Sequence, residues 1–80
     1  MKILVTGGTG YIGSHTCIEL IESGYEVIVV DNLSNSSIES LKRVEKITKN
    51  IIPFFKIDIN NKSKLTKIFE NYKIDGVIHF

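Results

Sequence analysis

Several residue types are scarce in this sequence, and each scarcity excludes a class of protein. The 80 residues include no tryptophan, one proline and one cysteine, Cys17. A single cysteine cannot form an internal disulfide, which excludes a disulfide-stapled fold and favours a reducing compartment. No apolar run approaches the roughly 20 residues of a membrane-spanning helix. We therefore expect a cytoplasmic protein with no membrane partner.

Charge of one sign is also lacking. Ten basic and nine acidic residues leave a formal net charge of +1 at pH 7, too little to attract a nucleic acid or an anionic membrane. We expect no nucleic-acid partner. The densest basic cluster falls within one expected helix and is most simply a solvated helix face; it consists of Lys42, Arg43, Lys46 and Lys49.

Some sites that short motifs would indicate are missing as well. Gly13 is followed by Ser14 rather than by Lys-Ser or Lys-Thr, which excludes a P-loop. The G-x-S-x-G pattern of a nucleophile elbow is absent. Neither His15 nor His79 has a partner at metal-ligand spacing, so the sequence predicts no metal site.

What the sequence does contain is a glycine-rich stretch, Thr6–Gly13, between an apolar run and a segment with helical apolar spacing. A strand, a glycine turn and a helix in this order are the setting of a phosphate-binding loop. The first backbone N–H groups of a helix have no internal partners and carry the positive end of its dipole. A pyrophosphate reaches them only where side chains are absent, so the stretch predicts a dinucleotide site.

Two glycine registers fit this prediction. Gly8, Gly10 and Gly13 satisfy G-x-G-x-x-G, and Gly7 with the same last two glycines satisfies G-x-x-G-x-x-G. In either register, the first glycine makes the tight turn and Gly10 lets the pyrophosphate approach. Gly13 lets the helix pack closely on the first strand.

The ligand prediction depends most on Asp31. This residue ends a second apolar run, 27–30, and lies 18 residues after Gly13, about where a dinucleotide fold places the carboxylate that binds the adenosine ribose. It can accept hydrogen bonds from both ribose hydroxyls and would repel a 2′-phosphate; no arginine is adjacent, so NAD is favoured over NADP. An exposed turn aspartate is the less favoured alternative. For the pyrophosphate we expect the backbone N–H groups of Tyr11 and Ile12.

Apolar runs and helical stripes alternate along the chain, which is typical of a parallel, doubly wound α/β sheet. Pro53 removes a ladder donor, so the third strand should begin after it or lie at an edge. This agrees with strand order 3-2-1-4, a partial Rossmann fold of four strands and three helices. We expect strands at 2–6, 26–30, within 51–57 and at 77–80, and helices at 11–23, across 38–47 and at 63–71.

The helices carry more detailed predictions. Ser36 with Glu39 fits a capping box before the second helix. Asn61 or Ser63 can cap the third, and Gly24 suits a left-handed end of the first. Apolar spacing predicts three buried stripes: Ile12, Leu20 and Ile21, with Thr16 and a buried Cys17 filling tighter gaps; Ile38, Leu41, Val44 and Ile47; and Leu65, Ile68 and Phe69.

Asp58 and Ile59 follow the third strand at the carboxyl end of the sheet, the side on which ligands bind. They could flank an adenine, with Asp58 as a hydrogen-bond acceptor. A plain turn-forming aspartate is nearly as good an account of Asp58, and both interpretations stay open.

Over its whole length the sequence resembles the extended short-chain dehydrogenase/reductase family. The glycine stretch and the residues after it, 6–16, carry that resemblance. The loop 31–36 and the closing run 77–80 are similar to those of the branch that interconverts UDP-glucose and UDP-galactose. The resemblance implies bound NAD, held by Gly7, Gly10, Tyr11, Ile12 and Gly13 at the pyrophosphate loop, by Asp31, Asn32, Leu33, Asn35 and Ser36 at the ribose, by Asp58 and Ile59 at the adenine, and by Phe80.

In that branch NAD takes a hydride from C4 of the UDP-sugar and returns it to the other face, and the base is a tyrosine with a lysine four residues later. No tyrosine here has that partner, because positions 15, 29 and 76 hold His, Val and Gly. The resemblance therefore implies no catalytic residue in this chain. A UDP-sugar substrate and a homodimer are implied only for a longer parent enzyme.

We expect residues 1–80 to be the N-terminal part of that enzyme's NAD-binding domain. A last strand at 77–80 would expose an apolar sheet edge, and such edges are normally covered. Three alternatives stay open. The parent could be another NAD-dependent nucleotide-sugar epimerase, dehydratase or decarboxylase, or a non-catalytic dinucleotide-binding module without the Tyr-x-x-x-Lys pair. The chain could also bind no ligand.

Overall fold

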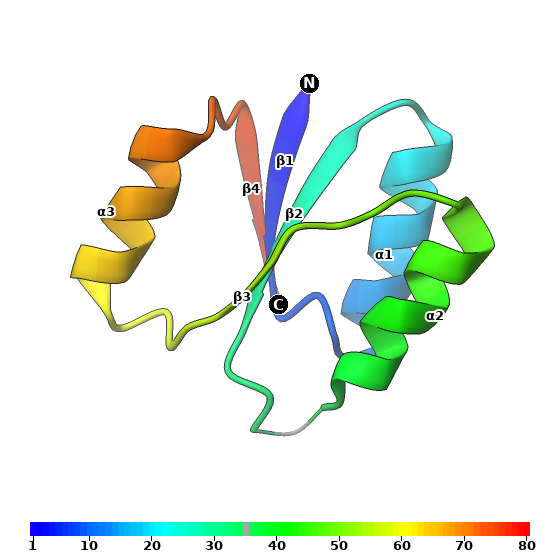
Figure 1. Ribbon diagram of the computed structural model, residues 1–80, viewed down its shortest axis with the longest axis horizontal. Helices are drawn as coiled ribbons and strands as arrows, with labels where there is room; N and C mark the ends of the chain where they lie inside the picture. The colour runs from blue at the N-terminus through cyan, green and yellow to red at the C-terminus, as the bar shows by residue number, and fades with distance from the viewer. Residues whose placement is uncertain (35) are drawn as a thin grey trace.

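The computed structural model describes residues 1–34 and 36–80, in which three helices alternate with four strands (Figure 1). The helices are α1 (Tyr11–Glu22), α2 (Ile38–Thr48) and α3 (Lys62–Asn71). The strands are β1 (Lys2–Thr6), β2 (Glu26–Asp31), β3 (Phe54–Lys56) and β4 (Gly76–His79).

The four strands form one parallel sheet in the order β3-β2-β1-β4. β3 lies at one edge of the sheet and begins directly after Pro53. The N–H group that proline lacks is therefore not needed for a hydrogen bond between strands. The Pro53 carbonyl still accepts a hydrogen bond from the Val29 N–H at 2.9 Å. The expected Rossmann-type α/β fold and its strand order are confirmed.

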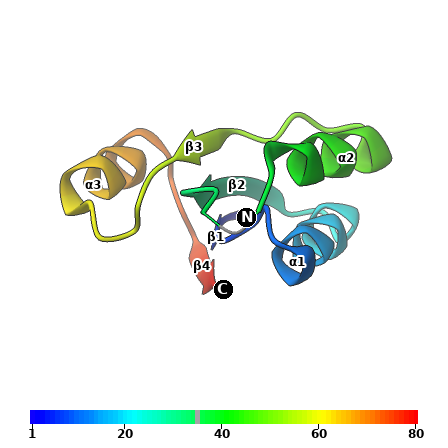
Figure 2. The same cartoon turned by 90° about the horizontal axis from the view of Figure 1, so that it is seen from below.

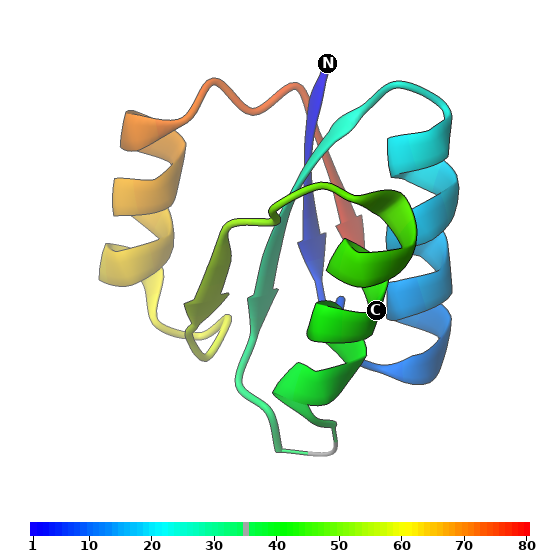
Figure 3. The same ribbon diagram turned by 45° about the vertical axis from the view of Figure 1, so that its right-hand side comes forward.

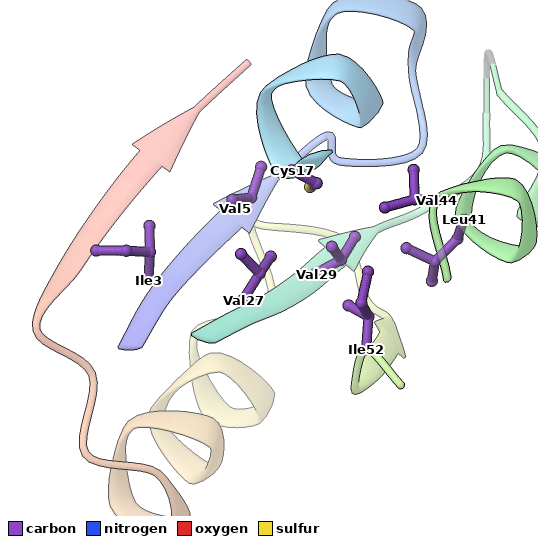
Figure 4. Packing of buried hydrophobic residues seen from close by; sticks show 8 residues of the cluster. All are labelled: Ile3, Val5, Cys17, Val27, Val29, Leu41, Val44 and Ile52. Atoms are coloured by element: carbon purple, nitrogen blue, oxygen red, sulfur yellow. The ribbon is translucent and has the colours of Figure 1, made fainter. Parts of the chain in front are cut away.

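The helices cover both faces of the sheet, α1 and α2 one face and α3 the other (Figures 2 and 3). Successive residues of a strand point to opposite faces, so β1 and β2 contribute to two cores at once. The core under α1 and α2 consists of Ile3, Val5, Cys17, Val27, Val29, Leu41, Val44 and Ile52 (Figure 4). The core under α3 consists of Leu4, Ile28, Val30 and Ile68. Burial on both faces explains why these strands read as continuous apolar runs.

The set of buried residues in α1 differs in part from the predicted apolar stripe. Ile12, expected in the apolar stripe, is 66% exposed, whereas Leu20 and Ile21 pack against the core. The buried residues of the helix are Gly13 and Cys17, four positions apart. Ile12 lies one position before Gly13, which turns it about 100° around the helix toward solvent. The buried side of α1 therefore begins at Gly13. A search for apolar side chains does not find this position, because glycine has no side chain.

Two other predicted stripe residues are also exposed, Ile47 by 54% and Phe69 by 47%. Each step of three residues falls about 60° short of a full helical turn, so the four predicted positions in α2 sweep about 180° around it. Only the middle two, Leu41 and Val44, are buried. In α3 the buried residue is Ile68, and Phe69 points about 100° away from it.

The predicted capping box at the start of α2 is wrong. The N-cap is Ser37, whose Oγ accepts a hydrogen bond from the Glu39 N–H at 3.2 Å. Ser36, one residue earlier, has its hydroxyl against Thr9 in the glycine loop instead. Ser36 therefore makes a tertiary contact with Thr9, although the local sequence pattern predicted that it would cap α2.

The ends of the other elements lie close to the prediction, as is usual for element boundaries. Asn61 caps α3 by accepting the N–H of the third helical residue at 3.2 Å, and the helix begins one residue earlier than expected. Gly24 follows α1 with φ +94°, and β4 begins at Gly76 rather than Val77.

The four basic residues within 42–49 are all exposed, as expected. No helix among the described residues is long and apolar enough to span a bilayer.

Candidate cofactor-binding site

A groove of about 290 Å³ lies at the carboxyl ends of the strands, where α/β folds bind their ligands. The loops that leave β1 and β2 meet the end of β4 at this edge of the sheet (Figures 1 and 3). The lining residues are Thr6, Gly7, Gly10, Val30, Asp31, Asn32, Ser34, Ser36, Ile57, Ile59, His79 and Phe80.

At two positions of the loop, Gly7 and Gly13, other parts of the chain come so close to the backbone that a side chain would not fit. Gly7 has φ +74°, and a Cβ there would lie 3.1 Å from the Cβ of Phe80. A Cβ at Gly13 would lie 2.2 Å from the carbonyl oxygen of Gly7, closer than real Cβ contacts. Gly13 therefore lets α1 pack closely against the glycine loop at the end of β1, where we predicted packing on the strand itself.

Gly8 and Gly10 differ in what surrounds them. Gly8 is buried, and a Cβ there would lie 2.8 Å from Cγ1 of Val29 in β2. Gly10 lines the groove, and a Cβ there would lie 3.5 Å from the carbonyl oxygen of Gly7, an ordinary contact. Its backbone, with φ −73° and ψ 171°, suits any residue. The absent side chain of Gly10 thus widens the groove without serving the packing of the protein.

The start of α1 faces this region without a side-chain cap. Gly10 is the N-cap and offers no side-chain acceptor, and the first turn holds no acidic residue. The first helical bond runs from the Ser14 N–H to the Gly10 carbonyl at 2.8 Å, so the three preceding N–H groups have no intrahelical partner. The Tyr11 side chain is 81% exposed and stacks edge-on against His15, with ring centroids 4.8 Å apart. What α1 can offer an anion is therefore backbone N–H groups and the positive end of its dipole.

Asp31 is held firmly at the wall of the groove. It is 9% exposed, and its Oδ1 accepts the Leu33 N–H at 2.9 Å. Its Oδ2 accepts the Thr9 N–H at 3.2 Å and also the Thr9 hydroxyl. The Ser36 hydroxyl lies 3.4 Å from Oδ2 and 2.5 Å from the Thr9 hydroxyl. A buried carboxylate is costly unless it is hydrogen-bonded, and donors from two loops meet that need here.

The sequence matches a known family over almost its whole length. Residues 4–80 match the family described as GDP-mannose 4,6 dehydratase. The chain belongs to this family.

Similar proteins include UDP-glucose 4-epimerases. The UDP-glucose 4-epimerase of Dictyostelium discoideum is 61% identical over 79 residues, which make up 99% of this chain and 23% of that protein. The structure of the Bifidobacterium longum UDP-glucose 4-epimerase in complex with NAD+ and UDP matches with a TM-score of 0.97 and 45% identity over 100% of this chain and 24% of its own. The Stenotrophomonas maltophila enzyme, with bound NAD and formylated UDP-arabinopyranose, matches with a TM-score of 0.97 and 41% identity over the same shares, 100% and 24%.

This chain therefore spans about a quarter of the length of the relatives that it matches. The similarity to enzymes that act on UDP-glucose, which the sequence motifs implied, is confirmed.

The groove brings together seven of the residues that the resemblance assigned to the cofactor: Gly7, Gly10, Asp31, Asn32, Ser36, Ile59 and Phe80. Five others do not line it: Tyr11, Ile12, Gly13, Leu33 and Asp58. Leu33 acts through its N–H on Asp31, with φ +61°. The exposed Asp58 accepts the Asn60 N–H at 2.8 Å, which is the turn-forming role left open above. Asn35 lies outside the described residues.

Four lining residues were missed from the sequence: Thr6, Val30, Ile57 and His79. A further one, Ser34, lies within the stretch 31–36 that the resemblance assigned to the ribose. Thr6 and His79 are register partners in the β1–β4 pair, and the Thr6 Oγ lies 2.5 Å from His79 Nδ1. The signal that would have found all four is their position near the carboxyl end of an expected strand. Thr9 was missed for another reason, since no local pattern connects it with Asp31.

Proposed function

We propose that residues 1–80 form the NAD-binding part of a UDP-glucose 4-epimerase, an isomerase that interconverts UDP-glucose and UDP-galactose. The observation that carries the proposal is the Asp31 carboxylate, which lines the same groove as Gly10 beside the uncapped start of α1. The 61% identity to the Dictyostelium enzyme supports this choice among the members of the family. The NAD in two similar structures supports the cofactor.

The groove suits a dinucleotide because it offers two kinds of contact. The backbone N–H groups of Tyr11 and Ile12 would hold the pyrophosphate, for which Gly10 leaves room. Asp31 would accept hydrogen bonds from the adenosine ribose. The other proposed members of the site are Gly7 and Gly13 in the loop, Asn32, Leu33, Asn35 and Ser36 beside the ribose, Asp58 and Ile59 beside the adenine, and Phe80.

The chain's own residues bind and orient the cofactor, and they supply no base. When bound, NAD would provide the hydride acceptor for C4 of a UDP-sugar. None of the tyrosines, Tyr11, Tyr25 and Tyr72, is followed by a lysine four residues later. Proton transfer would therefore belong to other parts of the protein, and this part would hold the nicotinamide cofactor in place.

Asp31 would also select NAD over NADP. A 2′-phosphate near this carboxylate would bring two negative charges together in a poorly solvated place. The single arginine, Arg43, belongs to α2 and is not among the residues that line the groove beside Asp31.

Three finer features belong to the same proposal. Interconversion of UDP-glucose and UDP-galactose would place the protein in galactose metabolism. The free, buried Cys17 supports a reducing, cytoplasmic location. The family resemblance also suggests a homodimer, which sedimentation of the intact protein would test; a monomer at micromolar concentration would contradict it.

The decisive experiment combines nucleotide release with turnover. The protein is purified from its own source and denatured, and its intact mass and released small molecules are measured together. We expect NAD to be released and the undenatured sample to convert UDP-galactose to UDP-glucose. Release of NADP, or of no nucleotide from a protein that also fails to bind added NAD, would contradict the proposal.

A nucleotide-sugar dehydratase is the second candidate, because the matching family is described by a dehydratase. Product analysis separates the two activities. An epimerase returns a sugar of unchanged mass, whereas a dehydratase releases water and lowers the mass of the sugar nucleotide. We expect UDP-galactose to give a product of unchanged mass and GDP-mannose to give none.

A further inference from the structure

Three side chains around the groove form the most closely bonded polar cluster of the described residues. Asp31 ends β2, Thr9 belongs to the glycine loop and Ser36 precedes α2. Thr9 is 1% exposed and does not line the groove. It lies 22 positions from Asp31 and 27 from Ser36 along the chain, so only the tertiary structure brings the three together.

The hydroxyl protons determine the direction of the hydrogen bonds in this cluster. Each hydroxyl has one proton to donate, and an ionised carboxylate has none. The Thr9 hydroxyl donates to Oδ2 of Asp31. The Ser36 hydroxyl can donate to the Thr9 Oγ at 2.5 Å or to Oδ2 at 3.4 Å. Because the Thr9 proton is already directed at Oδ2, the shorter contact needs the proton of Ser36, and we assign it there. The cluster is therefore a relay in which Ser36 donates to Thr9 and Thr9 donates to Asp31, and each bond strengthens the next.

The relay determines which carboxylate oxygen can still accept a hydrogen bond. A carboxylate has about four acceptor positions, two on each oxygen. On Oδ2 both positions are occupied, by the N–H and the hydroxyl of Thr9. On Oδ1 the described residues occupy one, through the Leu33 N–H at 2.9 Å. Within residues 1–34 and 36–80, the acceptor position that remains for a ligand is on Oδ1.

We propose that Thr9 is a positioning residue for cofactor binding, which acts by turning Asp31 so that Oδ1 meets the ribose hydroxyls. This inference rests on the proposed function, because it names the residue that orients the proposed ribose contact. Without the Thr9 hydroxyl, Oδ2 loses its shortest charge-assisted hydrogen bond and keeps only two longer ones, from the Thr9 N–H at 3.2 Å and the Ser36 hydroxyl at 3.4 Å. The carboxylate is then no longer held in one rotation, and its contact with the ribose weakens.

The test uses two nucleotides as probes, ADP and 2′,3′-dideoxyadenosine diphosphate, which lacks both ribose hydroxyls. Their binding is measured by calorimetry on the protein and on Thr9→Val, which keeps the backbone N–H and the side-chain shape but removes the hydroxyl. We expect Thr9→Val to weaken ADP binding about tenfold, the loss of one hydrogen bond to a charged group. The affinity for the dideoxy nucleotide should stay within about twofold, because that ligand has nothing for Oδ1 to accept.

Two further variants serve as controls. Thr9→Ser keeps a hydroxyl at the same place and should restore ADP binding. Thr16→Val removes a hydroxyl that donates to the Ile12 carbonyl at 3.0 Å within α1 and is not hydrogen-bonded to any member of the relay. This variant should change neither affinity. Unchanged binding of the dideoxy nucleotide by Thr9→Val also shows that this variant is folded.

The outcomes separate this inference from the proposed function. If the protein prefers ADP and Thr9→Val keeps that preference, the positioning role is overturned and the proposed function stands. Equal losses for both nucleotides would make Thr9 a merely structural residue and also overturn the inference. A protein that binds neither nucleotide, or does not distinguish them, has no ribose contact of the proposed kind, and both proposals then fail.

Discussion

At the scale of single residues, the glycines before α1 have different physical reasons to be glycine. Gly7 has a positive φ, Gly8 fits under Val29, and Gly13 nearly touches the carbonyl oxygen of Gly7. Gly10 has an unstrained backbone and ordinary space for a Cβ. The first three are therefore needed by the fold, whereas Gly10 serves the groove that it lines.

Matched alanine substitutions test this division. Gly13→Ala should lower the free energy of unfolding by about 2 kcal/mol, because a Cβ 2.2 Å from the Gly7 carbonyl oxygen forces the backbone apart. Gly10→Ala should lower it by less, about 0.5–1 kcal/mol, because its Cβ would stand 3.5 Å from that oxygen and only the preference for glycine over alanine at an N-cap is lost. Gly10→Ala should nevertheless weaken NAD binding by about tenfold or more, as its Cβ projects where the pyrophosphate is proposed to lie.

Urea denaturation gives the stabilities and calorimetry the affinities. A Gly10→Ala variant that binds NAD as well as the unsubstituted protein would refute the assignment of Gly10 to the ligand. A Gly13→Ala variant of unchanged stability would refute the close approach of α1 to the glycine loop.

At the scale of elements, the position of each helix follows from which of its residues meet the sheet. α1 packs through Gly13 and Cys17, and Cys17 is completely buried in the core shown in Figure 4. Burial raises the pKa of the Cys17 thiol from 9.0 to about 11, because the thiolate would lose its solvation there. The ionisation of this thiol therefore reports on the contact between α1 and the sheet.

The shift predicts a loss of stability at alkaline pH. Between pH 9.0 and about 11 the folded chain keeps a proton that the unfolded chain releases, so the free energy of unfolding falls as pH rises through this window. The contribution is complete below pH 9 and amounts to about 2–3 kcal/mol, at roughly 1.4 kcal/mol per pH unit. Urea denaturation at a series of pH values measures it.

Cys17→Ala is the control for this prediction. The variant is less stable at every pH because it leaves a small cavity, but it lacks the thiol and therefore the thiol's pH dependence. All other ionisable side chains are the same in the two proteins, so a difference between their pH profiles comes from the thiol. Parallel pH profiles for the two proteins would contradict the pKa shift.

At the scale of the whole molecule, the groove assembles residues from the loops after β1 and β2, the segment after β3 and the end of β4. Since the groove exists only when the sheet is formed, a ligand that binds there stabilises the folded state as a whole. NAD at 100 times its dissociation constant should add about 2.7 kcal/mol to the free energy of unfolding. For a domain of this size that raises Tm by about 10–20 °C.

Thermal denaturation with NAD and with NADP at equal concentration measures this effect. We expect the larger rise in Tm with NAD, because Asp31 disfavours the 2′-phosphate. Equal rises would mean that Asp31 does not face the ribose, and the absence of a rise with either nucleotide would argue against a dinucleotide site.

Sequence by itself determined the parts of this protein that depend on neighbouring residues. Apolar runs predicted the strands and their burial on both faces, Pro53 predicted the edge strand, and the glycine spacing with Asp31 predicted where the groove lies. Each of these signals acts over a few residues, through backbone sterics, hydrogen-bond donors or side-chain alternation.

Only the tertiary structure decided which side chains of those elements meet. Ser36 is bonded to Thr9 rather than capping α2, and Ile12 is exposed because the buried side of α1 is formed by Gly13 and Cys17. The relay from Ser36 through Thr9 to Asp31 joins positions 22 and 27 apart, for which no local spacing exists. The physical reason is that a buried carboxylate takes its hydrogen bonds from whatever donors the packed fold brings to it.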